Sequence, residues 1–267
     1  MYLYLTVAHT IIFVPYIMGL AIFVGVISGL LGISGGFILT PLMITLGIPP
    51  AIAVGSASAQ VFAASLSAVT VYHKKRLIPY RFALTLITGG IIGVICGIML
   101  FRYLSIYYNL ELMIQYGFII LLLLVSGLLF LPPPQSNKIL TPDTATKTHF
   151  FKFVITGFII GVLSGILGIG GGFLIIPALT YYICVNGKDA IIISQTNVMC
   201  VSLISFIMHA VINHNIDPVL SIILVIGGII GSHIGLWFGC KISPRTSRYI
   251  FMSIITSTAF ILIYGLI

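Results

Sequence analysis

Long apolar runs alternate with short polar interruptions along the whole chain. Runs of suitable length for membrane helices cover residues 10–31, 51–72, 82–101, 111–131, 151–168, 191–212, 219–238 and 249–267. Each is close to the ~20 apolar residues that a transmembrane helix needs. The pattern therefore predicts an all-α polytopic membrane protein.

Two shorter apolar pieces follow the first and fifth runs, at residues 37–46 and 173–183. At about 1.5 Å per residue, each piece reaches only about half of the ~30 Å hydrocarbon thickness of a bilayer. We therefore expect two half-helices, each forming a hairpin with the run before it.

A glycine-rich motif precedes each short piece. Residues 25–41 read GVISGLLGISGGFILTP, and residues 161–177, which lie 136 positions later, read GVLSGILGIGGGFLIIP. A second pair, GGIIGVICG at 89–97 and GGIIGSHIG at 227–235, is better explained by close helix packing. The repetition indicates an internal duplication: a first transmembrane repeat at 1–131, a polar linker at 132–150 and a second repeat at 151–267.

The basic residues favour opposite orientations for the two repeats. The loop at 72–81 carries four Lys or Arg residues, whereas its counterpart at 213–218 carries none; the next pair of loops, near Arg102 and at 240–248, shows the reverse bias. Cytoplasmic loops are enriched in Lys and Arg. The pattern therefore predicts inverted-topology repeats with a cytoplasmic linker, external termini, and hairpins that enter from opposite faces.

Composition supports a membrane location. The chain is 60% hydrophobic and 6% charged, with a mean hydropathy of +1.24 and a formal net charge of +8. The basic residues lie between apolar runs, where they set topology and meet lipid headgroups, so we expect membrane lipid and no nucleic acid as a partner. The four cysteines have no metal-like spacing, and neither a metal nor a cofactor is expected. We expect an integral protein of the bacterial inner membrane.

The glycine tips of the two hairpins are the candidate substrate site. Irregular backbone at membrane depth is tolerated only where protein or a watery cavity covers it. Two half-helix N-termini that meet there would offer partial positive charge to an anion, and nearby hydroxyl and amide groups could complete its coordination. The candidate substrate-binding residues are Gly32, Ser34, Gly35, Gly36, Phe37, Ser56, Ser58 and Gln60 in the first repeat, and Gly168, Gly170, Gly171, Gly172, Phe173, Ser194, Gln195, Thr196 and Asn197 in the second.

Packing is the alternative explanation for these residues, because small and hydroxylated side chains also line ordinary helix contacts in membranes. His209 and His233 lie within apolar runs and could carry a proton, although a neutral packing histidine explains each of them as well. All four carboxylates fall in loops or at the ends of runs, so a buried carboxylate relay is not expected. No pattern indicates catalysis.

The paired GxxSGxxGxxGGFxxxP pattern resembles the TauE/SafE family of sulfite exporters, also called TSUP, over nearly the whole chain. The matching positions are Gly32, Gly35, Gly36 and Pro41, and Gly168, Gly171, Gly172 and Pro177. The first tip departs from the second by having Ser34 in place of Gly170. In the second repeat residues 191–193 are isoleucines, where the first has the more polar residues 54–56, which makes an asymmetric site an expectation.

The resemblance implies a membrane transporter of sulfur-containing anions. With it, the sequence predicts a secondary transporter, working as an exporter, of a small anion such as sulfite, sulfoacetate or another organosulfonate, by alternating access around the two tips. Transport of a non-sulfur anion such as a small carboxylate and a role as a membrane-embedded scaffold or assembly factor are the alternatives. The identity of the anion, the coupling ion and the formation of a homo-oligomer stay open at this point.

Overall fold

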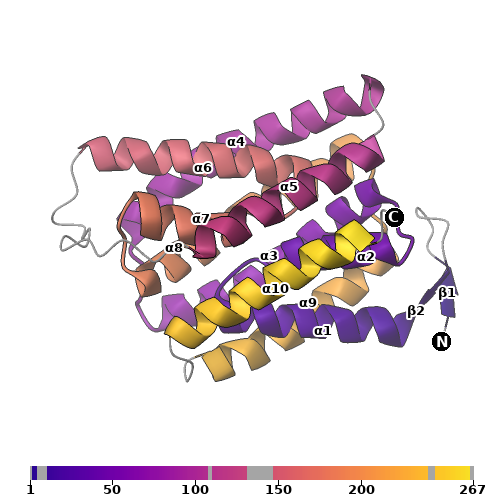
Figure 1. The fold of residues 1–267 in the computed structure, drawn as a ribbon, viewed down its shortest axis with the longest axis horizontal. Helices are drawn as coiled ribbons and strands as arrows, with labels where there is room; N and C mark the ends of the chain where they lie inside the picture. Colours follow the sequence, from indigo (N-terminus) through magenta and orange to yellow (C-terminus); the bar gives the residue numbers. More distant parts are fainter. Residues whose placement is uncertain (1, 5–10, 108–109, 131–146, 240–243, 265–267) are drawn as a thin grey trace.

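The structure, a computed structural model, is a helical bundle in which residues 2–4, 11–107, 110–130, 147–239 and 244–264 are described (Figure 1). A short antiparallel pair of strands, β1 (Tyr2–Tyr4) and β2 (Ile11–Phe13), precedes the bundle. The first half then contains α1 (Val14–Leu31), α2 (Gly36–Thr45), α3 (Pro50–Lys74), α4 (Tyr80–Tyr107) and α5 (Leu110–Phe130). The second half contains α6 (Lys147–Leu167), α7 (Gly172–Pro177), η1 (Ala178–Tyr182), α8 (Gly187–Met208), η2 (His209–Asn213), α9 (Pro218–Gly239) and α10 (Pro244–Tyr264).

The prediction of an all-α polytopic membrane protein is confirmed. Seven of the described helices are long and apolar enough to cross a membrane. Each predicted run contains one long helix. The first run differs at its start, because residues 11–13 pair as a strand and α1 begins only at Val14, with a proline in its first turn. Proline suits that position because the first N–H groups of a helix have no intrahelical partner.

The two short apolar pieces form short helices, as their lengths predict. α2 has 10 residues and carries Pro41 inside it, while α7 has 6 residues, ends at Pro177 and continues into the five-residue π-helical turn η1. The hydroxyl of Thr180 donates to the carbonyl of Ile176 at 2.8 Å in this wider turn. Proline lacks an N–H group, so both helices lose one backbone hydrogen bond at the same place.

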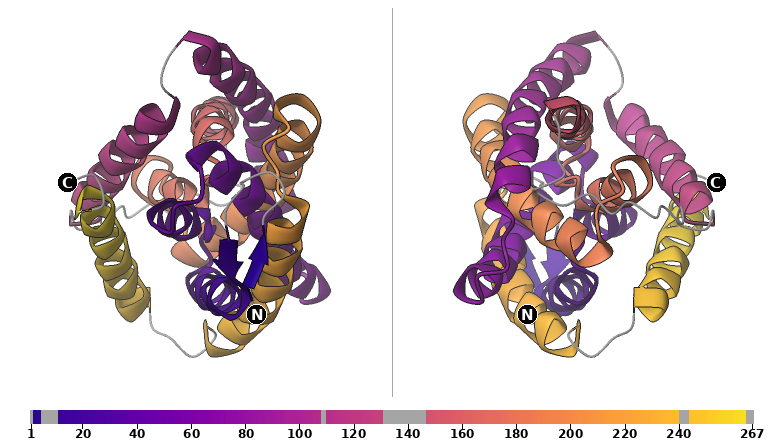
Figure 2. Two further views of the ribbon diagram at one scale, coloured as in Figure 1. Left: turned by 90° about the vertical axis from the view of Figure 1, so that its right-hand side faces the viewer. Right: turned by 90° about the vertical axis from the view of Figure 1, so that its left-hand side faces the viewer.

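Helices from the two halves interleave. α1 packs along α9, and α4 packs along α6; α3 and α8 pack on each other in the middle of an arc that runs α1, α9, α3, α8, α4, α6. α5 and α10 form a pair on the other side, and α2 and α7 lie between this pair and the arc (Figure 2). The two short helices are therefore enclosed by protein.

Every one of these contacts has a counterpart in which the halves exchange roles. The pair α1 and α9 corresponds to α6 and α4, and the pair α3 and α9 corresponds to α8 and α4. In Figure 1, α2 lies toward the end of the molecule that holds both marked chain ends, while α7 lies toward the opposite end. The two hairpins thus run into the molecule from opposite ends.

Glycines permit the closest helix crossings. A methyl group added at Gly231 of α9 would lie 2.2 Å from the carbonyl oxygen of Ile22 in α1. One added at Gly93 of α4 would lie 2.2 Å from the carbonyl oxygen of Phe158 in α6. The interpretation of the GGIIG repeats as packing motifs is confirmed.

Candidate functional site

Each hairpin turns at a glycine with left-handed backbone. Gly32 ends α1 with φ of 69°, and its N–H donates to the carbonyl of Ser28 at 2.9 Å. Gly168 follows α6 with φ of 66°, and its N–H donates to the carbonyl of Ser164 at 2.8 Å. Glycine adopts this conformation without the steric cost that a side chain brings. The repeated motif therefore produces the same turn twice.

The two turns meet at the buried centre of the molecule. The hydroxyl of Ser34 donates to the carbonyl of Ile169 at 2.5 Å and accepts from the N–H of Gly172 at 3.2 Å. Just beyond, the rings of Phe37 and Phe173 stack with centroids 4.9 Å apart. The glycine tips, predicted as a substrate site, are brought together by direct contact with each other.

The difference between Ser34 and Gly170 has a steric reason. A methyl group added at Gly170, where φ is +70°, would lie 2.6 Å from a methyl of Val61 and 3.3 Å from Cβ of Ser34. Only one of the two tips can therefore carry a side chain in this space. Ser34 fills it, and its hydroxyl bonds the other tip.

This arrangement makes the two half-helix N-termini unequal. Ser34 caps the first N–H of α7, whereas the N–H of Gly36, the first residue of α2, makes no hydrogen bond among the residues that the structure describes. The first N–H groups of a helix carry a partial positive charge. The beginning of α2 is therefore the more suitable place for an anion.

Besides Ser34, four of the predicted polar residues are engaged within the protein. Ser56 accepts from the N–H of Asp217 at 3.3 Å, so it helps to seat the loop before α9. Ser194 donates to the carbonyl of Gly172 at 3.2 Å. Ser58 and Thr196 each donate to a carbonyl of their own helix, at 2.6 and 2.7 Å. The hydroxyl protons of Ser58, Ser194 and Thr196 are therefore already used in the fold.

The three amide side chains are different, because each is buried with at least one amide atom that has no hydrogen-bond partner in the described part of the chain. Gln60 is fully buried, and neither of its amide atoms has a hydrogen-bond partner among the described residues; the same holds for Oε1 of Gln195 and Oδ1 of Asn197. A buried polar atom without a partner is rare in native proteins and costs about 1–3 kcal/mol. These three residues are the best candidates for ligand contact among those that the sequence predicts.

Gln60 and Asn197 occupy matching places in the two halves, at positions 60 of α3 and 197 of α8. Each rests against a glycine at matching positions of α9 and α4. A methyl group added at Gly228 would lie 2.8 Å from Cγ of Gln60, and one added at Gly90 would lie 2.7 Å from Oδ1 of Asn197. The fold keeps room for both amides with these two glycines.

The amide of Gln60 lies beside the beginning of α2. Its Oε1 is 3.6 Å from the position that a methyl group would take on Gly35, the N-cap residue of that helix. Rotation of the side-chain amide by 180° would present its NH₂ group there instead. An anion at this place would meet a helix N-terminus and an uncharged amide donor.

Two further hydroxyl side chains without partners were not among the site residues predicted from the sequence. Ser164 lies in α6 one turn before the second glycine tip, and Thr40 precedes Pro41 in α2. Both are buried, and their hydroxyl oxygens have no partner within the ranges that the structure describes. The sequence did contain a signal for Ser164, because both copies of the glycine motif carry a serine in GxxSG. Its counterpart, Ser28, donates to the carbonyl of Ile33 at 2.6 Å.

The structure separates the two candidate histidines. His209 is fully buried at the start of η2, with Nδ1 3.2 Å from Nδ2 of Asn213 and its ring edge-on to Phe101. His233 lies exposed on α9, and its Nδ1 donates to the carbonyl of Ile229 at 2.9 Å. Only His209 therefore sits in the protein interior. Within the described ranges, no group of three or more His, Cys, Asp or Glu residues could hold a metal ion.

The fold and this centre define a polytopic helical membrane protein in which the glycine tips of two hairpins meet in the interior. The profile of the family described as "Sulfite exporter TauE/SafE" matches residues 17–262. The chain therefore belongs to the TauE/SafE family.

Curated relatives span similar lengths. The chain is 28% identical over 247 residues to the probable membrane transporter protein YjnA of Bacillus subtilis, covering 90% of this chain and 94% of the relative. It is 27% identical over 266 residues to the probable membrane transporter protein MJ0441 of Methanocaldococcus jannaschii, covering 92% and 93%. A segment of 67 residues is 43% identical to the sulfite exporter TauE/SafE family protein 3 of Arabidopsis thaliana, covering 25% of this chain and 14% of that protein. No solved structure matches the chain.

These matches identify a membrane transporter family and not a family of enzymes, as the sequence predicts.

Proposed function

We propose that the protein is a secondary transporter that exports a small anion, most favourably a sulfur oxyanion or organosulfonate, by alternating access around the two glycine tips. The observation that carries the proposal is the unpartnered amide of Gln60 beside the uncapped beginning of α2. Both groups suit an anion and neither carries a full charge. Membership of the TauE/SafE family supports the transport function.

The substrate class rests on the chemistry of the site and on the relatives. A helix N-terminus contributes about 0.3–1 kcal/mol to anion binding when exposed and up to ~2 kcal/mol when partly buried. Such a site selects the sign of the charge and still releases its ligand. One relative is named a sulfite exporter family protein, and we carry that substrate class to this chain as part of the proposal.

Alternating access requires two halves that can exchange roles. The paired contacts of α1 with α9 and of α6 with α4, and hairpins that run in from opposite ends, support two inverted repeats with boundaries at 131 and 151. In the proposed cycle each hairpin moves with its own group of helices, so the seam between Ser34, Ile169 and Gly172 opens toward one face at a time. The described structure has this seam closed.

The test is thermal unfolding of the detergent-purified protein with sulfite, thiosulfate, sulfoacetate, taurine, sulfate, acetate or lactate at equal ionic strength. A ligand that binds the folded state at a hundred times its Kd stabilises it by about 2.7 kcal/mol. We expect a rise in melting temperature with sulfur oxyanions or sulfonates. A rise with acetate or lactate alone would favour the carboxylate alternative, and a flat panel would favour a scaffold without a small ligand.

The proposed topology is tested by single cysteines in a background without the native ones. We expect Lys75→Cys, in the exposed turn after α3, to react only from the cytoplasm of inner-membrane preparations. Asn215→Cys, in the loop before α9, should react only from outside. These sides follow from the distribution of Lys and Arg. Labelling of both residues from the same side would contradict the inverted repeat and the external termini.

A further inference from the structure

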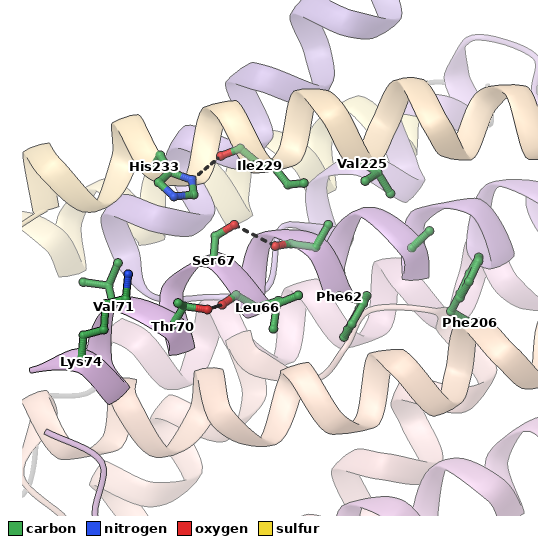
Figure 3. Close-up of a pocket in the computed structure, with 12 residues that line it drawn as sticks. Phe62, Leu66, Ser67, Thr70, Val71, Lys74, Phe206, Val225, Ile229 and His233 are labelled. Carbon is green, nitrogen blue, oxygen red and sulfur yellow. Dashed lines mark hydrogen bonds between the residues drawn. The ribbon is translucent and has the colours of Figure 1, made fainter. Parts of the chain in front are cut away.

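A groove outside the central site runs along α3. It has a volume of about 560 Å³ and lies between α3, α9 and the end of α8, with Phe62, Leu66 and Thr70 of α3 facing Ile229 of α9 and Phe206 of α8 (Figure 3). From Ala59 to Lys74 the helix rises about 22 Å, which exceeds half of the ~30 Å hydrocarbon thickness. The groove is thus long enough to follow one bilayer leaflet from the middle of the membrane to its surface.

One end of the groove is cationic, and the rest is mainly apolar. Lys74 and His233 lie together at one end, and Phe62 and Phe206 lie toward the other (Figure 3). Lys74 is exposed in the last turn of α3 and is followed by the exposed Lys75 and Arg76. This is the end that the distribution of basic residues predicts to be cytoplasmic.

The corresponding positions at the other end of the molecule, which the internal duplication relates to Lys74 and His233, carry no basic residue. Positions of α3 correspond to positions of α8 that lie 137 later (60 against 197), so Lys74 corresponds to Val211. Positions of α4 correspond to those of α9 that lie 138 later (90 against 228), so His233 corresponds to Ile95. The lysine and the histidine therefore belong to one end of the molecule only. Internal symmetry does not explain them.

We propose that this groove binds one acyl chain of an anionic phospholipid of the cytoplasmic leaflet, with the lipid phosphate at Lys74. The apolar walls match a hydrocarbon chain, and Leu66 and Ile229, which are 43% and 39% exposed, leave the groove open along its side. The cytoplasmic leaflet is the one rich in anionic lipid, and a basic residue at its surface contributes about 1 kcal/mol of attraction. The site is independent of the proposed transport cycle.

The test is native mass spectrometry of the full-length protein released from detergent with equal amounts of phosphatidylglycerol and phosphatidylcholine. The wild type should retain phosphatidylglycerol preferentially. Lys74→Gln should retain about fivefold less of it. Thr70→Trp, at an exposed groove position, should reduce retention of both lipids by filling the groove.

Lys188→Gln serves as the matched control, because Lys188 is an exposed lysine in the first turn of α8, outside the groove. It should retain phosphatidylglycerol as the wild type does. Equal retention of the two lipids by the wild type, or unchanged retention in both groove variants, would overturn the proposal. So would a protein dimer that Thr70→Trp dissociates, because a second copy would then occupy the groove.

Discussion

Replacing Gln60 by methionine is expected to make the protein more stable and to lower its anion flux about tenfold or more. The side chain is fully buried and neither amide atom has a partner in the described structure, so removing the amide relieves a cost of about 1–3 kcal/mol. The same change removes a proposed substrate contact, and each ~1.4 kcal/mol of lost binding is tenfold in affinity. Stability and activity should therefore move in opposite directions.

The measurement pairs melting temperature without substrate with anion uptake into proteoliposomes. Asn197→Leu, the equivalent change in the second half, should behave in the same way. Ser65→Ala is the control on α3, because Ser65 is buried but its hydroxyl already donates to the carbonyl of Val61 at 2.7 Å. Wild-type flux in stable Gln60→Met and Asn197→Leu proteins would remove both amides from the substrate site.

Gly93→Leu is expected to abolish the folded protein. A methyl group alone would lie 2.2 Å from the carbonyl oxygen of Phe158, so α4 and α6 would have to separate along their whole crossing. Overpacking a core typically destabilises a protein by about 1–3 kcal/mol. A clash with rigid backbone should cost at least the upper end of this range. The yield of monodisperse protein in size-exclusion chromatography measures the effect.

Two comparisons make this result specific. Gly231→Leu, which meets the carbonyl oxygen of Ile22 in the equivalent crossing of α9 and α1, should fail as Gly93→Leu does. Gly127→Leu in α5 should give wild-type yield, because no atom of the described residues lies within 4 Å of a methyl group at that position. A normal yield of Gly93→Leu would mean that the helices do not cross as closely as described.

The same geometry makes the tip glycines unsuitable for a test of transport. A methyl group at Gly36 would lie 2.9 Å from Val61 and 3.0 Å from the carbonyl oxygen of Gly168. At Gly171 the φ of 75° strains any side chain. Valine at either place would disturb the fold together with any binding, whereas the amides can be replaced at nearly constant volume.

Local sequence features were sufficient to predict the helices. Hydrophobic runs marked every long helix, and the length of the pieces after each glycine motif marked α2 and the α7 and η1 segment. The duplication predicted matching turns at Gly32 and Gly168, because the same spacing of glycines produces the same left-handed turn. The strand pair before α1 carried no comparable pattern.

The sequence could not separate the engaged polar residues from the unpartnered ones. Ser56 and Gln60 lie one helical turn apart in the same small-residue stretch. Ser56 bonds the loop at Asp217, whereas the amide of Gln60 bonds none of the described residues. That difference depends on which distant segment packs on each face of α3. The contact between the two tips likewise depends on Ser34 meeting Ile169 across 135 positions of sequence.

The absence of charged side chains around the tips determines how the membrane potential acts on the proposed transport cycle. No Asp, Glu, Lys or Arg occurs in residues 14–73 or 153–187, which contain both glycine tips and both short helices. In the proposed cycle the empty protein therefore reorients without moving a side-chain charge of these segments through the field, and the membrane potential acts on the bound anion. A potential of 100 mV is worth about 2.3 kcal/mol per elementary charge. With a negative interior, that electrical work by itself drives an anion outward.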